Sequence, residues 1–335
     1  MKKRVQSEID FLSKLLDESS VINKSHVCCS NLPHFKAIVE IMKQEKDVIA
    51  VQKVFMLKQD DKTNRFEVDV VSRNGACWIK AKAMKPEAIQ SIFQGNGTFG
   101  TKSIVDIAQQ LVECASQHYH HFKSPQCVFW FTKGVTEDVA EELNDMGVMV
   151  KGKIVDSDTP LQNESIEINL EPITIANLDV TSLIVMVSSV TNGGAHYNFD
   201  NEILQTQAEE ERKEASLPAI NQFLNGKKMI VTQTAWEKFM GILEVIGGDS
   251  ERQRAQELLQ KVTIVENSPS ERSKKLKLGP KIKQHHIDIF GTGDQYKAST
   301  LTANQAIVRA AAEQGIEFSV FLHPARALTE QKQTL

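Results

Sequence analysis

The sequence predicts an α/β protein in which an N-terminal α/β domain with a mixed sheet precedes a C-terminal domain with a parallel sheet covered by helices on both faces. Strand-like apolar runs alternate with helical patterns throughout residues 170–335, which is typical of parallel sheets. The polar, turn-rich segment DSDTPLQNES at residues 156–165 divides the chain. A chain of 335 residues with 41% apolar and 24% charged side chains is long enough for two cores. We therefore expect domains at residues 1–155 and 170–335, joined by a linker at 156–169.

The N-terminal domain is predicted to contain two helices, three strands, a long helix and a final strand, helix and strand. Apolar periodicity places the first helices from about Glu8 and from about Leu32. SRNG is a plausible hairpin turn between the second and third strands. An amphipathic helix is expected from Thr101, with its apolar residues on one face. The five expected strands begin near Val48, Arg65, Ala76, Cys127 and Val148, and the helix between the last two covers residues 136–147.

The C-terminal domain alternates strand and helix again. A charged helix is expected from about Asn201, with EEERKE as its solvated face. The segment at 268–286 has Pro and Gly at turn positions and eight basic or imidazole side chains among 19 residues, which predicts a long exposed loop. This loop is expected to lead into a strand, IDIFG. The expected strands begin near Ile173, Lys228, Ile287 and Thr300.

Composition limits the compartment and the partners. The basic start KKR runs into an amphipathic helix without the apolar segment of a secretory signal, and no apolar run approaches the ~18 residues of a membrane helix. The odd count of five cysteines forms no CxxC or Cys/His zinc spacing, which favours reduced thiols. We expect a cytoplasmic and/or nuclear protein that is not secreted and has no membrane partner. The net charge of only -4 means that any nucleic-acid surface must be local.

Three acidic residues follow apolar runs in the second half of the chain, namely Asp179, Glu237 and Asp294. Ligands of open α/β sheets bind outside the carboxyl ends of the strands, so acids from separate strand ends can converge there. Convergent carboxylates suit Mg²⁺ or Mn²⁺, which prefer oxygen ligands. Each residue also has a structural explanation: Asp179 as a helix N-cap, Glu237 as a solvent-facing side chain, and Asp294 as a turn residue after GTG.

The order and spacing of these acids resemble the PIN-like nuclease family over roughly residues 170–325. In that family a first-strand Asp, a Glu early in a later helix and a further Asp precede a strand that ends in a TnD-type turn. Thr302, Ala303 and Asn304 occupy the turn here, so an Asn stands where the family usually has its fourth acid. The resemblance implies a metal site formed by Asp179, Glu237 and Asp294, with Asn304 as a weaker ligand, and Mg²⁺ or Mn²⁺ as cofactor.

The whole chain also resembles an uncharacterised animal protein family of the chromosome seven open reading frame twenty-five type, which has a PIN-like C-terminal domain. Segments that carry the resemblance include FEVDVVSRNGACWIKAKA, QCVFWFTKGVTEDVAEELNDMGV and FLHPARALTE. Since that family is named without an activity, it supports the fold more than the function.

Several side chains near these acids are candidates for contact with a nucleic acid. Lysines in the loop at 268–286 could neutralise phosphates, although a solvated loop is the common role of such a segment. Arg326 could hold a phosphate or form a structural ion pair. The predicted nucleic-acid-binding residues are Thr181, Ser182, Lys274, Lys275, Lys277, Lys281, Lys283 and Arg326.

Three further motifs favour structural roles. GNGTFGTKS from Gly95 satisfies GxGxxG, but the segment before it is helical in pattern rather than strand-like, so a turn is the better interpretation. HYHHF cannot place all three imidazoles on one helix face. FEVDVV and WIKAKA resemble the hairpin of restriction-type nucleases, with Asp69 and Lys80 in the acid and lysine positions, but Trp78 occupies the place of the second acid. This half therefore reads as a degenerate or purely structural α/β unit.

These observations lead to one main functional hypothesis and two alternatives. The main hypothesis is a metal-dependent PIN-like endoribonuclease acting on single-stranded RNA. The missing fourth acid, replaced by Asn304, argues against its catalytic activity. The first alternative keeps the fold without the chemistry, as a catalytically inactive RNA-binding or protein-interaction module. The second is a nucleotide-binding protein that uses the loop from Gly95, which would require a strand before that loop.

Overall fold

The computed structural model describes residues 1–19, 31–59, 62–96, 102–155 and 172–334. The chain divides into two compact units, Met1–Asn169 and Leu170–Leu335. The expected linker at 156–169 and most of the glycine loop at 95–103 lie outside the described residues. Within the described ranges, no helix combines the length and the apolar character needed to cross a membrane.

The N-terminal unit is built on one five-stranded mixed sheet. Its strand order is β1-β2-β3-β4-β5, in which β1, β2 and β3 are antiparallel and β3, β4 and β5 are parallel. The strands are β1 Ala50–Gln59, β2 Lys62–Ser72, β3 Cys77–Lys82, β4 Gln126–Val135 and β5 Met149–Ile154. The helices are α1 Lys2–Ser19, α3 Leu32–Gln44, α4 Pro86–Phe93, α5 Ile104–Gln117 and α6 Glu137–Asp145.

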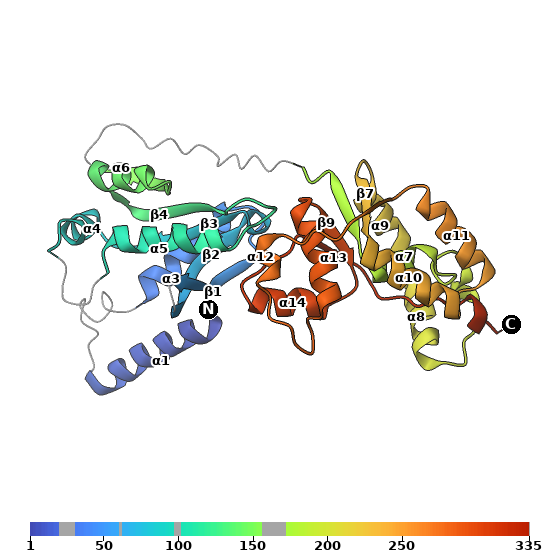
Figure 1. Cartoon of the computed structure of the whole chain (residues 1–335). Coiled ribbons are helices and arrows are strands. Elements are labelled where there is room, and N and C mark those ends of the chain that lie inside the picture. Colours follow the sequence, from blue (N-terminus) through green and yellow to red (C-terminus); the bar gives the residue numbers. More distant parts are fainter. Residues whose placement is uncertain (20–30, 60–61, 97–101, 156–171, 335) are drawn as a thin grey trace. The chain divides into compact units, whose positions relative to one another are not determined.

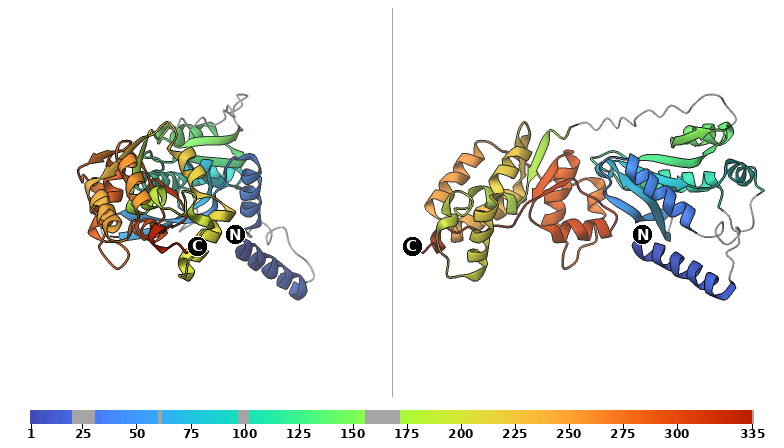
Figure 2. Two further views of the ribbon diagram at one scale, coloured as in Figure 1. Left: turned by 90° about the vertical axis from the view of Figure 1, so that its right-hand side faces the viewer. Right: turned by 180° about the vertical axis from the view of Figure 1, so that it is seen from behind.

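Two apolar clusters cover the two faces of this sheet. The helix α5 begins at Ser103, whose hydroxyl accepts a hydrogen bond from Val105 N, and buries Ala108 and Leu111 against Trp78 and Phe129. Helix α3 packs its apolar residues in the second cluster, with Ile79 of the central strand (Figure 1; Figure 2 shows α3 from behind). The predicted mixed-sheet α/β unit is confirmed.

The C-terminal unit is built on an all-parallel five-stranded sheet with the order β10-β9-β6-β7-β8. The strands are β6 Ile175–Leu178, β7 Lys228–Thr232, β8 Thr263–Val265, β9 Ser299–Thr302 and β10 Val320–Leu322. The helices are α7 Val180–Val187, α8 Glu202–Lys213, α9 Ser216–Leu224, α10 Gln233–Ile246, α11 Asp249–Leu259, α12 Glu271–Lys274, α13 Gln284–Gln295 and α14 Gln305–Glu313. The predicted parallel sheet flanked by helices is confirmed.

The strand order creates a switch point between β6 and β9. From β6 the chain adds β7 and β8 on one side, then returns to add β9 and β10 on the other. Connections therefore diverge from these two central strands, and in open α/β sheets ligands bind outside the carboxyl ends at such a point. The last residues of β6 and β9, Leu178 and Thr302, mark this position.

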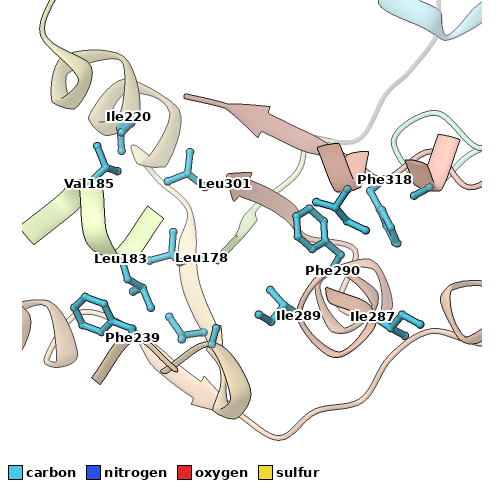
Figure 3. Packing of buried hydrophobic residues seen from close by; sticks show 14 of the residues in the cluster. Leu178, Leu183, Val185, Ile220, Phe239, Ile287, Ile289, Phe290, Leu301 and Phe318 are labelled. Atoms are coloured by element: carbon cyan, nitrogen blue, oxygen red, sulfur yellow. The ribbon is translucent and has the colours of Figure 1, made fainter. Parts of the chain in front are cut away.

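Figure 3 shows how strands and helices share the C-terminal core. Leu178 of β6 and Leu301 of β9 are fully buried among side chains of α7 and α10 such as Leu183 and Phe239. Phe290 of α13 lies beside Phe318, with ring centroids 5.6 Å apart. Burial of this apolar surface is the main stabilising contribution to the unit.

Three expectations about the C-terminal elements are wrong. The segment at 268–286 is not one long exposed loop, because it contains α12 and the start of α13 and buries Leu276 and Ile282. IDIFG is not a strand: it lies inside α13, with Ile287, Ile289 and Phe290 all buried. A short apolar run buried on several sides has the same pattern in a strand and a buried helix. The charged helix expected from Asn201 is also two helices, since α8 ends at Lys213 and α9 begins at Ser216. The Glu211 carboxylate accepts hydrogen bonds from the backbone N–H and the hydroxyl of Ser216, which stabilises the start of α9.

Candidate functional site

Asp179 lies at the carboxyl end of β6 and starts helix α7. Its Oδ1 accepts hydrogen bonds from Ser182 N at 2.8 Å and from the Thr181 hydroxyl at 2.7 Å. The N-cap explanation of Asp179 is therefore confirmed. Its side chain is almost fully buried, at 4% exposure, so the carboxylate is held by protein donors rather than by water.

The same carboxylate joins β6 to β9. Its Oδ2 accepts from the Thr302 hydroxyl at 2.5 Å, and the buried Ser182 hydroxyl lies 2.9 Å from Oδ1. Ser182 also contacts Leu301 O and lies 3.2 Å from His323 Nε2. His323 Nδ1 donates to Pro324 O at 2.9 Å, which leaves Nε2 as an acceptor. Burial lowers the pKa of His323, although the nearby Asp179 carboxylate partly opposes that shift.

A cavity of about 640 Å³ opens beside Asp179 at the switch point. Its polar lining residues come from α7, α10, α13 and the end of β9, and its apolar wall comes mainly from α10 and α13. The polar residues are Asp179, Thr181, Lys238, His285, His286 and Asn304, and the apolar residues include Val180, Ile242, Val245, Ile246, Ile289 and Phe290. Residues 238, 241, 242 and 245 recur at helical spacing, so one face of α10 forms this wall.

Two histidines in the first turn of α13 form a polar side of the cavity. Burial lowers the pKa of both His285 and His286, and the Lys238 ammonium adds to the effect on each. His286 Nδ1 accepts from Lys283 N at 3.2 Å, so the Nε2 nitrogen carries the proton of the neutral ring. The exposed side chains of Lys281 and Lys283 directly precede this turn.

Asp294 lies far along α13 from this cavity. It is eight residues beyond His286 on the same helix, which corresponds to about 12 Å along the axis. Its carboxylate forms an ion pair with Arg272, which contacts both oxygens, and accepts from the Ser270 hydroxyl at 2.6 Å. The prediction that Asp294 joins Asp179 is wrong, because a helix replaces the expected strand and carries the acid to the other end.

Glu237 also lies outside the cavity. It is exposed in the first turns of α10, and its carboxylate accepts from Gln233 Nε2 at 2.8 Å. Its neighbour Lys238 is the residue that lines the cavity. Asn304 does line it, while its Oδ1 caps α14 by accepting from Ile307 N at 3.3 Å.

The residues present do not fit the predicted Mg²⁺ or Mn²⁺ centre. No three His, Cys, Asp or Glu side chains of the described residues lie in an arrangement that could hold a metal ion. Among the described residues that line the switch-point cavity, Asp179 is the single carboxylate, and both its oxygens already accept hydrogen bonds. The expected meeting of Asp179, Glu237 and Asp294 is therefore not formed.

The predicted nucleic-acid-binding residues separate into two groups. Ser182 is fully buried, and the side chain of Arg326 is 2% exposed with its guanidinium paired to Glu210 and Glu211, so both side chains are engaged within the protein. Lys274 is exposed but pairs with Glu271 at 2.6 Å. Thr181 lines the cavity, and the remaining loop lysines, Lys275, Lys277, Lys281 and Lys283, are exposed.

Sequence reasoning missed Lys238, His285 and His286 as cavity residues, and His323 as part of the Asp179 network. The adjacent histidines were visible as part of the basic segment at 268–286. Their position became recognisable only with α13 as a helix, since its first turn then lies next to α10 and the end of β6.

The chain belongs to a family of unknown function (DUF5614), whose profile matches residues 1–175. A second profile, described as a protein of unknown function (DUF1308), matches residues 176–335. Among solved structures, VapBC2 from Rickettsia felis bound to a DNA fragment from its promoter shows a similarity that covers 44% of this chain and 98% of that chain. The sequence identity is 10% and the TM-score is 0.25.

Proposed function

We propose that the C-terminal unit is a non-catalytic module of PIN-like fold that binds single-stranded RNA at the switch-point cavity. The observation that carries the proposal is the combination of an apolar wall with a basic edge at the carboxyl ends of β6 and β9. A module of this kind also agrees with the proposed membership in the chromosome seven open reading frame twenty-five type family. We propose a cytoplasmic or nuclear location, which the free, buried thiols of Cys77, Cys114 and Cys127 support.

Single-stranded nucleic acids bind where bases can lie against apolar or aromatic side chains while cations follow the backbone. Here Val245, which is 76% exposed, and Ile246 offer apolar surface at the cavity. Lys238 lies on the same helix, and Lys281 and Lys283 precede α13. These lysines are positioned to neutralise phosphates of a strand whose base occupies the cavity.

The state of Asp179 favours binding over cleavage. A cleavage site that uses a divalent cation needs carboxylate oxygens free to face the ion. Asp179 instead uses its oxygens to cap α7 and to bind Thr302 of β9. The carboxylate thus holds the switch point together, and the cavity beside it is left for a ligand.

The test is binding of a fluorescently labelled single-stranded RNA to the full chain, measured by anisotropy at several salt concentrations in EDTA. We expect binding that survives EDTA and weakens with salt. Lys238→Ala and Lys283→Ala should each weaken it and each reduce the salt slope by about 0.7, the value for one single-strand phosphate. Lys261→Ala, an exposed lysine at the end of α11, is the matched control and should bind as wild type does. Equal binding by all three variants would overturn the proposal.

The enzymatic alternative is tested with the same full-length chain in an RNA cleavage assay. Its proposed residues are Asp179, Glu237, Asp294 and Asn304, with Mg²⁺ or Mn²⁺. Cleavage of the RNA by wild type in Mn²⁺, lost in Glu237→Gln, would replace the binding proposal with a nuclease. Glu237 is the informative position because it is exposed, and its replacement should leave folding intact.

A further inference from the structure

The central sheet of the N-terminal unit contains a fork between β2 and β3. These strands pair only over Val70–Ser72 and Cys77–Ile79. Beyond that point β2 continues its pairing with β1, while β3 pairs with β4 as far as Lys82. The next residues on the two strands, Asp69 and Lys80, therefore lie at the point where the sheet opens.

Asp69 is held at the fork by three partners. Its Oδ2 accepts from Ala81 N at 2.8 Å and pairs with Lys80 Nζ at 3.0 Å, and its Oδ1 lies 3.4 Å from His34 Nε2 of α3. Burial alone would raise the pKa of Asp69, but the hydrogen bond from His34 and the charge of Lys80 hold it below its usual value. The buried negative charge of Asp69 is thus neutralised by the positive charge of Lys80. The Lys80 ammonium also donates to Glu67 O at 3.0 Å, so one of its three N–H groups remains.

Lys82 lies two residues further along β3, on the same face as Lys80. Its Nζ lies 5.2 Å from the centre of the Phe129 ring, and within the described part of the chain it donates no hydrogen bond and pairs with no carboxylate. Burial, followed by repulsion from Lys80, lowers the pKa of Lys82 to about 8, while Asp69 weakly opposes this. A desolvated ammonium without a counter-ion is the unusual feature of the fork.

We propose that the fork between β2 and β3 binds the phosphate group of a small anion, with Lys82 as the principal ligand and the remaining Lys80 N–H as the second. The charge of the Lys80 ammonium is neutralised by the Asp69 carboxylate. The Lys82 ammonium therefore gives the fork a net charge of one positive unit. The Cα atoms of Lys80 and Lys82 are about 6.6 Å apart along the strand, and both flexible side chains can reach oxygens of one tetrahedral anion. Since the ammonium is already desolvated, an anion gains from the pairing without the usual penalty for removing the lysine from water.

The burial of Lys82 favours a small anion. Lys82 is half-buried, which leaves room for a small ion at its ammonium rather than for a large ligand across it. Among Asp69 and its two side-chain partners, His34 is the most exposed, with 34% of its side chain accessible. This inference is independent of the proposed RNA-binding site, which belongs to the other unit.

The test is titration of the full chain with inorganic phosphate, with sodium chloride at matched ionic strength as the ion control. The Lys82 ammonium is followed by NMR of ¹³C-labelled lysines. Without phosphate its pKa should be near 8. Phosphate should raise it by about one unit for each tenfold preference for the charged amine. A Lys82 pKa that stays unchanged at saturating phosphate would overturn the inference.

Variants separate the fork from the basic loop of the other unit. Lys82→Met should abolish phosphate binding to the N-terminal unit, whereas Lys85→Met, an exposed lysine just beyond β3, should leave it unchanged. If Lys82→Met does not fold, the wild-type NMR titration still decides the question. A nucleoside monophosphate is the second probe: tighter binding than inorganic phosphate assigns the site to a phosphate ester, and equal binding assigns it to the free ion.

Discussion

The Thr302 hydroxyl donates a hydrogen bond to Oδ2 of Asp179 at 2.5 Å, and this contact links the carboxyl ends of β6 and β9 across 123 residues of sequence. Thr302 also accepts from Asn304 N at 2.9 Å, so the contact fixes the turn that leads into α14. Asp179 therefore organises the switch point from both sides. A residue that looked catalytic in the sequence has a clear structural role in the fold.

This role makes Asp179 a stability residue. Asp179→Ala removes the α7 N-cap and leaves the buried Ser182 N and Thr302 hydroxyl without their acceptor. We expect a loss of about 3 kcal/mol of unfolding free energy, from a cap worth about 1 kcal/mol and at least one buried donor left unsatisfied. Asp179→Asn keeps one oxygen and should lose less. Urea unfolding measures both, and an Ala variant as stable as wild type would contradict this role.

The Arg272–Asp294 pair should also stabilise the C-terminal unit. The Asp294 side chain is 4% exposed and that of Arg272 is 24% exposed. Removing one partner of a fully buried pair loses about 3–5 kcal/mol. Because Arg272 is partly solvated, we expect about 2 kcal/mol for Asp294→Ala. The exposed Lys274–Glu271 pair is the control, and Lys274→Ala should not measurably change the urea midpoint. Equal effects of the two variants would show that burial does not matter here.

The parallel sheet and the position of Asp179 could be predicted because alternating strand and helix patterns carry that information, whereas the order of the strands could not. The run ITIANL predicted β6, and the Asp after it was placed correctly at the strand end. In contrast, the sequence could not distinguish a strand from a buried helix at IDIFGTGD. Because the segment was assigned to a strand, Asp294 was expected at a strand end, although it lies at the far end of α13. For the same reason His285 and His286, in the first turn of α13, were not recognised as cavity residues.

The glycines of GTG explain the error. They suggested a turn, but both lie within α13 with helical neighbours. A Cβ on Gly291 would meet Ser273 and Pro269, and one on Gly293 would meet Asn177 of β6 and Thr300 of β9. These glycines permit close packing of the helix rather than a change of direction. Close approach between elements distant in sequence leaves no local signal.

Stability should fall as the pH is lowered from 7.5 to 5.5. Among the described residues, four histidines have a folded-state pKa below the unfolded value of about 6.5, chiefly because of burial. These are His121, His285, His286 and His323. The unfolded chain then binds more protons than the folded chain, so their contribution is complete above about pH 6.5 and is lost as the pH falls toward the folded pKa values.

Urea unfolding at several pH values measures this slope. His286→Gln should reduce it, because protonation of His286 at Nδ1 would break the hydrogen bond from Lys283 N. Two buried carboxylates with lowered pKa values, Glu45 and Asp69, act in a separate window below about pH 4.5. A protein more stable at pH 5.5 than at 7.5 would be inconsistent with folded-state histidine pKa values below the unfolded value.

Gly293→Ala tests the packing of α13 against the sheet. The added methyl would lie too close to Asn177 Nδ2 and Thr300 Oγ1, two atoms that are themselves joined by a hydrogen bond of 3.0 Å. Overpacking of this kind should destabilise the protein by about 2 kcal/mol. Gly241→Ala in α10 is the matched control, since a Cβ there meets nothing within 4 Å. Replacing a helical glycine in open space should stabilise by about 0.5–1 kcal/mol. Opposite signs of the two shifts in urea midpoint are the expected result, and a stabilising Gly293→Ala would show that α13 does not need this close approach.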